Sequence, residues 1–144
     1  MLTHADILRL VPHQGAMCLL DNVRQWSAGA IACHAVSHLD PANPLRRNGR
    51  LAAVMGIEYA LQAAALHGAL LADGARQPAG VVAAMREVAM TVAWLDDPAF
   101  GVLHIAAEML ARDAAALSYA FHVRAESGRA LLSGRATVVQ PVAA

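Results

Sequence analysis

The chain of 144 residues contains no lysine, only two cysteines and few aromatic residues, and its formal net charge is zero. All eleven basic residues are arginines, which we interpret as a coding bias without functional meaning. Without excess positive charge, the chain offers no electrostatic surface for nucleic acid or an acidic membrane. The composition therefore argues against a nucleic-acid-binding protein.

The two cysteines, Cys18 and Cys33, do not form a CxxC motif. Isolated cysteines of this kind are typical of small buried thiols in a reducing compartment. The first residues also show no basic region followed by an apolar core and a cleavage site. We therefore expect a cytoplasmic protein.

Motifs of several enzyme classes are missing as well. The sequence has no HExxH, no paired histidine or cysteine spacing and no acidic cluster, so we expect no metal site. It has no GxSxG and no glycine-rich phosphate loop. We therefore expect no cofactor, and nucleophilic catalysis is poorly supported.

Hydrophobic residues are abundant, at 58% of the chain, which indicates extensive burial and a subunit interface. The most apolar segment, Val54–Ala72, is almost long enough to cross a membrane. It carries Glu58, Gln62 and His67, which are costly in lipid. We therefore expect a helix enclosed by protein, and no membrane partner.

The order of elements predicts an α+β fold in one domain over residues 1–144. A short helix starts at Thr3 as N-cap and stops at Pro12. Two strands, 21–26 and 30–38, are joined by a turn, and a long loop leads to a helix over 51–74. Four strands follow, over 80–95, 101–113, 116–127 and 129–142. This pattern is typical of an antiparallel sheet wrapped around one long central helix.

Glu58 and Gln62 form the most informative pair of polar residues. Their spacing of four places them on one face of the central helix, near its N-terminal end. A buried, unpaired carboxylate has a raised pKa and can hold or donate a proton near neutrality. Local capping or pairing near the helix start is the alternative.

Several histidines are candidate partners of this carboxylate. His13 follows Pro12, which restricts the backbone, and His38 ends a strand just before the long loop. His67 lies on the opposite side of the helix from Glu58, so we expect a hydrogen-bonded core residue. For His34, His104 and His122 we expect structural or solvated roles.

Three segments, "PHQGAMCLLDNV", "DPANPLRRNGRL" and "GIEYALQAAALHG", together resemble the hot-dog fold 3-hydroxyacyl-[acyl-carrier-protein] dehydratases. The similarity is greatest to a divergent branch found in aryl-polyene pigment clusters. The resemblance implies a hot-dog fold and elimination of water from acyl thioesters in fatty acid or polyene-type biosynthesis. It also implies an acyl carrier protein or CoA thioester as the substrate.

The resemblance assigns Glu58 as the catalytic helix carboxylate, and Gln62, Met17, Ala53 and Arg50 as residues that line the substrate site. Arg50 stands where the family has a catalytic histidine. Arginine stays protonated, so Arg50 cannot remove a proton from carbon.

Three substitutes for the missing histidine remain open. His13 or His38 could supply the imidazole, or it could come from another hot-dog chain. The family site is shared between protomers, so a homodimer and a heterodimer both fit. A non-catalytic subunit of an active dehydratase and an acyl thioesterase are the alternative functions.

Overall fold

The computed structural model describes residues 1–75 and 80–139. It contains two α-helices, α1 (His4–Leu10) and α2 (Gly56–Leu71). The strands are β1 (Leu2–Thr3), β2 (Asn22–Trp26), β3 (Ala30–Ala35), β4 (Val81–Met90), β5 (Leu103–Arg112), β6 (Ala116–Arg124) and β7 (Ala130–Val139). Residues 140–142 of the last predicted strand lie outside the described residues.

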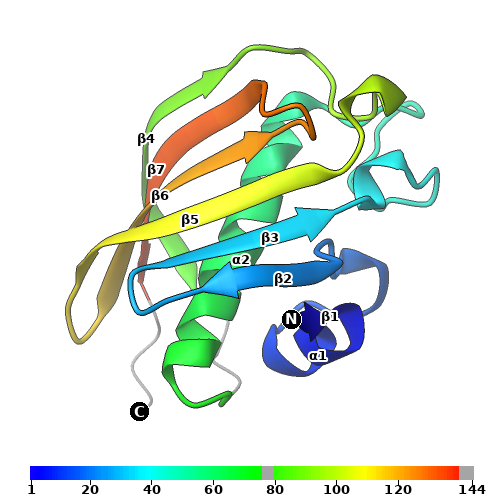
Figure 1. Ribbon diagram of the computed structural model, residues 1–144. Coiled ribbons are helices and arrows are strands. Elements are labelled where there is room, and N and C mark those ends of the chain that lie inside the picture. The colour runs from blue at the N-terminus through cyan, green and yellow to red at the C-terminus, as the bar shows by residue number, and fades with distance from the viewer. Residues whose placement is uncertain (76–79, 140–144) are drawn as a thin grey trace.

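The strands form one antiparallel seven-stranded sheet in the order β1-β2-β3-β5-β6-β7-β4. The sheet curves around α2, which lies along its concave side (Figure 1). Alternate residues such as Ile31, Cys33 and Ile105 turn inward and are buried. The predicted α+β hot-dog architecture is confirmed.

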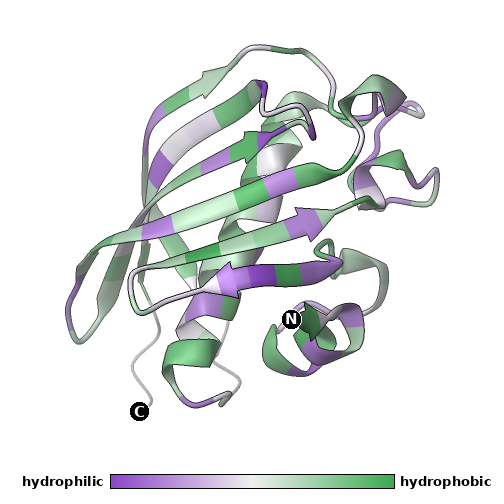
Figure 2. Ribbon diagram, in the orientation of Figure 1, coloured by the Kyte–Doolittle hydropathy of each residue, from purple (hydrophilic) through white to green (hydrophobic). Residues whose placement is uncertain are grey.

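Helix α2 is apolar over most of its length (Figure 2). It follows a 3₁₀ turn at Ala53–Met55, and after it Gly74 adopts a φ of 80° that favours glycine. The stretch Ala53–Leu71 has the length and composition of a membrane span, but half of it is buried inside the protein. We predicted an enclosed helix, and this holds for one side only. Ile57 and Leu61, on the other side, are half-buried within this chain.

The second predicted strand was too long. β3 ends at Ala35, because the carboxylate of Asp21 accepts a hydrogen bond from the amide of Val36 (2.6 Å). The hydroxyl of Ser37 also donates to the carbonyl of Leu19 (2.7 Å), and the chain turns into a 3₁₀ helix over Ser37–Leu39. His38 therefore does not end a strand. It is fully buried beneath the loop.

The two edges of the sheet differ. β1 has two residues and lies beside α1, whose N-cap Thr3 forms a capping box with Asp6, as predicted. β4 has ten residues and within the described chain pairs only with β7. Its pairing shifts register between Val82 and Ala84 and again between Arg86 and Ala89.

Both cysteines are buried and unpaired with each other. Burial raises the pKa of the Cys33 thiol to about 12, so this thiol is unreactive at neutral pH. The prediction of two small buried thiols is confirmed.

Candidate active site

Gln62 fixes the N-terminal segment onto α2. Its side-chain oxygen accepts a hydrogen bond from the amide of Leu19 (2.8 Å), and its side-chain nitrogen donates to the carbonyl of Met17. Gln62 is 1% exposed, so these bonds are shielded from water. The segment that starts at His13 therefore lies against the helix face that carries Glu58 and Gln62.

His13 and Glu58 lie close enough for the carboxylate to influence the imidazole electrostatically. Burial lowers the pKa of His13, and the Glu58 carboxylate acts in the opposite direction, since its charge favours a protonated imidazole. The Nδ1 atom of His13 is buried and has no hydrogen-bond partner among the described residues. Glu58 is half-buried. The structure thus brings a neutral imidazole within electrostatic range of a carboxylate.

His38 lies elsewhere. Burial is the largest influence on its pKa and lowers it. The weaker influences come from the Gly101 carbonyl and from the side chains of Asp21, Arg46 and Asp96. Both of its ring nitrogens are buried without a hydrogen-bond partner in the described structure. Of the two candidate histidines, only His13 has Glu58 among the groups that influence its pKa.

His67 is buried on the far side of α2. Its Nε2–H donates to the carbonyl of Ser27 (2.8 Å), and its Nδ1 accepts from the hydroxyl of Tyr119 (2.7 Å). The predicted role as a hydrogen-bonded core histidine is confirmed.

Ala53 lies at the start of the helical region and is buried. Its amide donates to the carbonyl of Ala93 (2.9 Å), and the neighbouring residue Ala52 forms a bridge with Trp94. The segment just after β4 is therefore tied to the residues just before Glu58.

Arg50 is held at the surface next to this junction. Its Nε donates to the carboxylate of Asp96 (2.9 Å), and its guanidinium lies 4.4 Å from the ring centre of Trp94. Arg46 pairs with the same carboxylate (3.4 Å). A surface cavity of about 540 Å³ is lined by Arg50, Trp94, Asp96 and also Arg129.

A second polar network was not predicted from the sequence. The hydroxyls of Tyr59 and Ser37 are 2.8 Å apart, and Asn43 donates to the Tyr59 hydroxyl (3.1 Å). Tyr59 follows Glu58 directly, so this network fixes the long loop to the same turn of α2. The only sequence signal was a tyrosine within an otherwise apolar helix. Its partners lie far away along the chain.

This arrangement suits acid–base chemistry. A neutral imidazole can accept a proton, and a nearby carboxyl group can donate one. Within residues 1–75 and 80–139, no cluster of three histidine, cysteine or acidic side chains is suited to hold a metal ion.

Comparison with known families gives one match over almost the whole chain. The ApeP-like family, described as ApeP dehydratase, matches residues 5–144. A search of curated proteins gives no match. The resemblance deduced from the three sequence segments is confirmed.

Solved structures with the same fold include dehydratases and thioesterases. The dehydratase heterocomplex ApeI:P from Xenorhabdus doucetiae has a chain with a TM-score of 0.78 and 24% identity, over 94% of this chain and 91% of that chain. Zebra fish thioesterase superfamily member 2 has a TM-score of 0.66 and 15% identity, over 96% and 93%. A hypothetical thioesterase from Streptococcus pneumoniae TIGR4, solved with coenzyme A, has a TM-score of 0.59 and 16% identity, over 83% and 84%.

Proposed function

Because the chain belongs to the ApeP-like dehydratase family, we propose that it removes water from 3-hydroxyacyl thioesters, with His13 and Glu58 as the catalytic pair. The observation that carries this proposal is the placement of the neutral His13 imidazole within electrostatic range of Glu58.

The two groups divide the elimination between them. His13 takes a proton from C2 of the acyl chain, and the electron pair of that C–H bond forms the C2=C3 double bond. The C3–O bond breaks as Glu58, which must be in its protonated form for this step, gives its proton to the departing hydroxyl, which leaves as water. The proton on His13 then returns to Glu58 through solvent, and the pair is ready for another turnover.

Other residues named from the sequence support this pair. We assign Gln62 a positioning role, because it is buried and holds the segment that carries His13. Met17 is half-buried in that segment and suits a wall of the acyl site. The amide of Ala53 is already bonded to Ala93, so any contact with substrate would involve its methyl group.

We call the edge of the sheet at β4 (Val81–Met90), which is unpaired within the described chain, the bare edge, and we propose it as the contact with a second hot-dog chain. Val81, Val82 and Met90 are 62%, 41% and 47% exposed, and a long apolar edge strand pairs readily with another chain. The similar structure from Xenorhabdus doucetiae is described as a heterocomplex. A partner on β4 would lie close to the junction of Ala52 with Trp94, which precedes the start of α2 and Glu58.

The proposed substrate is bound to an acyl carrier protein or CoA in the cytoplasm. Arg47 and Arg50 are exposed on the loop before α2, and they suit the acidic surface of a carrier protein or the phosphate of its arm. Arg46 is already held by Asp96 and by the carbonyl of His38.

The test is a dehydration assay with a 3-hydroxyacyl thioester, in which formation of the enoyl product is followed. Glu58→Gln and His13→Gln should each lower kcat by about 10²–10⁴-fold, the usual contribution of a positioned acid or base. His122→Gln, on the far side of the sheet, is the matched control and should retain full activity. Full activity of Glu58→Gln would refute the catalytic assignment.

A second candidate function is that of a non-catalytic subunit that shapes the site of an active partner. Arg50 at the position of the family histidine favours it. Activity of the complex that survives both Glu58→Gln and His13→Gln, with none from the purified chain alone, would support this role. A stable, active homodimer would oppose it. Release of free thiol without enoyl product would instead indicate a thioesterase, the activity named for several structures of the same fold.

A further inference from the structure

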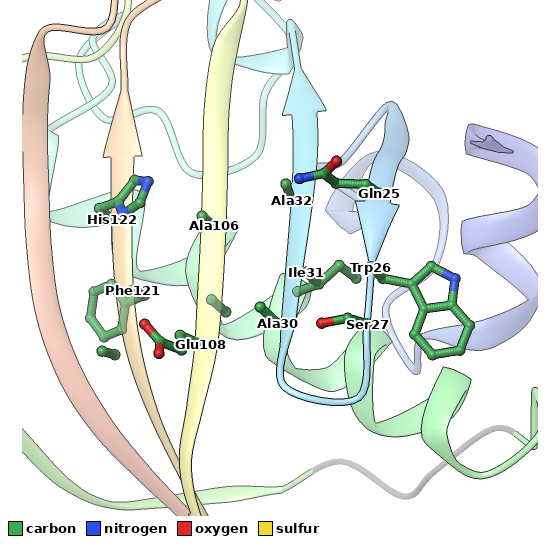
Figure 3. Close-up of a pocket in the computed structure, with 12 residues that line it drawn as sticks. Gln25, Trp26, Ser27, Ala30, Ile31, Ala32, Ala106, Glu108, Phe121 and His122 are labelled. Atoms are coloured by element: carbon green, nitrogen blue, oxygen red, sulfur yellow. The ribbon is translucent and has the colours of Figure 1, made fainter.

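The outer face of the sheet, on the side away from α2, carries a pair of histidines in direct register. His34 of β3 and His104 of β5 are opposite each other in the antiparallel ladder, and both are half-buried. Figure 3 shows the adjoining part of this face, where the short side chains of Ala32 and Ala106 lie between those of Gln25 and His122. The short alanine side chains leave open space beside the two imidazoles.

The two imidazoles approach each other through their nitrogens. Nε2 of His34 is 3.1 Å from Nδ1 of His104, and the ring planes are inclined at 70°. Two imidazole nitrogens that bind one Zn²⁺ ion at about 2.0–2.1 Å, with an angle between square and tetrahedral at the metal, lie about 2.9–3.4 Å apart. The observed separation falls inside this range.

We propose that His34 and His104 bind one divalent ion of the zinc type between β3 and β5. Among the described residues no third histidine, cysteine or carboxylate completes a cluster with them, so water fills the other positions on the ion. The site would therefore be open and exchangeable, unlike a closed structural zinc site with four protein ligands.

The surroundings of His34 keep its imidazole unprotonated at neutral pH. Burial, followed by the charges of His104 and Arg24, lowers the pKa of His34, while Glu126 acts in the opposite direction. A histidine must be unprotonated to bind a metal, and His34 meets this condition at neutral pH. A surface cavity of about 520 Å³ over the pair is also lined by His122, Arg124 and Glu126, which leaves room for an ion and its waters.

The site is separate from the proposed catalytic pair. His34 and His104 alternate with the buried Cys33 and Ile105 and so lie on the outer face, whereas Glu58 belongs to α2, which runs along the concave side (Figure 1). A bound ion would join two neighbouring strands and stabilise the folded state, since it binds that state alone. The proposal therefore stands or falls independently of dehydratase activity.

The test is a calorimetric titration of the purified protein with zinc chloride at neutral pH, together with thermal unfolding with and without zinc. We expect one ion per chain and a rise in Tm with zinc concentration. His34→Ala and His104→Ala should each weaken binding by at least about tenfold, since even loss of a residue that only orients a ligand has that effect. Alanine already occupies the neighbouring positions of this face, so both variants should fold.

His122→Ala is the control, because it removes a histidine of the same face that is not paired. Its affinity for zinc should match that of the wild type. The proposal is overturned if the wild type does not bind zinc, if either paired variant binds as well as the wild type, or if His122→Ala loses binding to the same extent. In the first case the pair is held by an imidazole–imidazole hydrogen bond alone.

Discussion

The two edge strands of the sheet, β1 and β4, differ in what covers them. At the β1 edge, α1 closes the sheet: Thr3 caps the helix, and His4 donates a hydrogen bond to the carbonyl of Leu20 (2.8 Å). At the β4 edge, the described chain leaves a strand of ten residues with exposed valines and methionine. Because an exposed apolar edge strand pairs readily with another chain, this difference is the basis for proposing the partner contact at β4 and not at β1.

The bare edge also leads to the candidate site. β4 continues into the segment that bridges Ala52 and Trp94, and Glu58 follows Ala52 closely along the chain. The covered edge supplies His13, in the segment between α1 and β2. The proposed catalytic pair thus joins a residue of the segment between α1 and β2 to a helix that starts next to the proposed interface.

The largest expected effect comes from charging the bare edge. Val82→Arg places a buried charge in any interface along β4, so we expect loss of the dimeric or heteromeric assembly and of dehydratase activity. Size-exclusion chromatography with light scattering measures the assembly. Leu110→Arg, at a similarly exposed apolar residue within β5, is the control and should assemble normally. An intact assembly in Val82→Arg would rule out β4 as the interface.

The next largest effect is expected when the contacts of Gln62 with the segment between α1 and β2 are removed. Gln62→Ala leaves the Leu19 amide and the Met17 carbonyl without their buried partner, so we expect about 2–4 kcal/mol less stability in urea unfolding. The activity should also fall, because His13 loses its support. Gln25→Ala, at an exposed glutamine of β2, should change neither quantity. Unchanged stability of Gln62→Ala would show that the segment is held by other contacts.

Acid should destabilise the folded chain. Burial lowers the pKa of both His13 and His38, so between their folded pKa values and the ordinary value of about 6.5 the unfolded chain binds more protons than the folded one. Stability therefore falls as the pH falls through this window. Urea unfolding between pH 7.5 and 5 should show a shallower loss for His38→Gln than for the wild type. An identical slope would contradict the lowered pKa of His38 in the folded state.

The smallest effect is expected at the cap of α1. Thr3→Ala removes the side-chain oxygen that accepts from the Asp6 amide, and loss of such a cap costs about 1 kcal/mol. We expect this loss in urea unfolding, with assembly unchanged, since the bare edge is untouched. Ser133→Ala, at an exposed serine of β7, is the control and should leave the stability unchanged. A change of assembly in Thr3→Ala would mean that the two edges are coupled.

Much of this fold is predictable from local patterns. The capping residues at Thr3 and Asp6, the alternation in β3 and the glycine after α2 each act over a few residues, so the sequence displays them. The three family segments likewise single out Glu58 and Gln62 by residue type and spacing alone. These features depend on short-range geometry, which spacing reports directly.

The remaining features depend on contacts between distant segments. The bend after Ala35 needs the Asp21 carboxylate from the segment before β2, and without it the sequence pattern places His38 wrongly at a strand end. The His34–His104 pair exists only because β3 and β5 adopt one particular register. Gln62 was expected at the substrate, whereas its amide bridges two backbone groups of the N-terminal segment. No local pattern encodes such pairings.

The two register shifts in β4 have a consequence for assembly. A shift interrupts the regular spacing of backbone groups and twists the strand, and Glu87, in the second one, has a φ of 56°. The free edge is thereby divided into short stretches, so an arbitrary extended peptide can bond along only part of it. A strand with matching interruptions can bond along all of it. The interrupted edge therefore suits the proposed hot-dog partner, and it hinders the repeated addition of strands that leads to fibres.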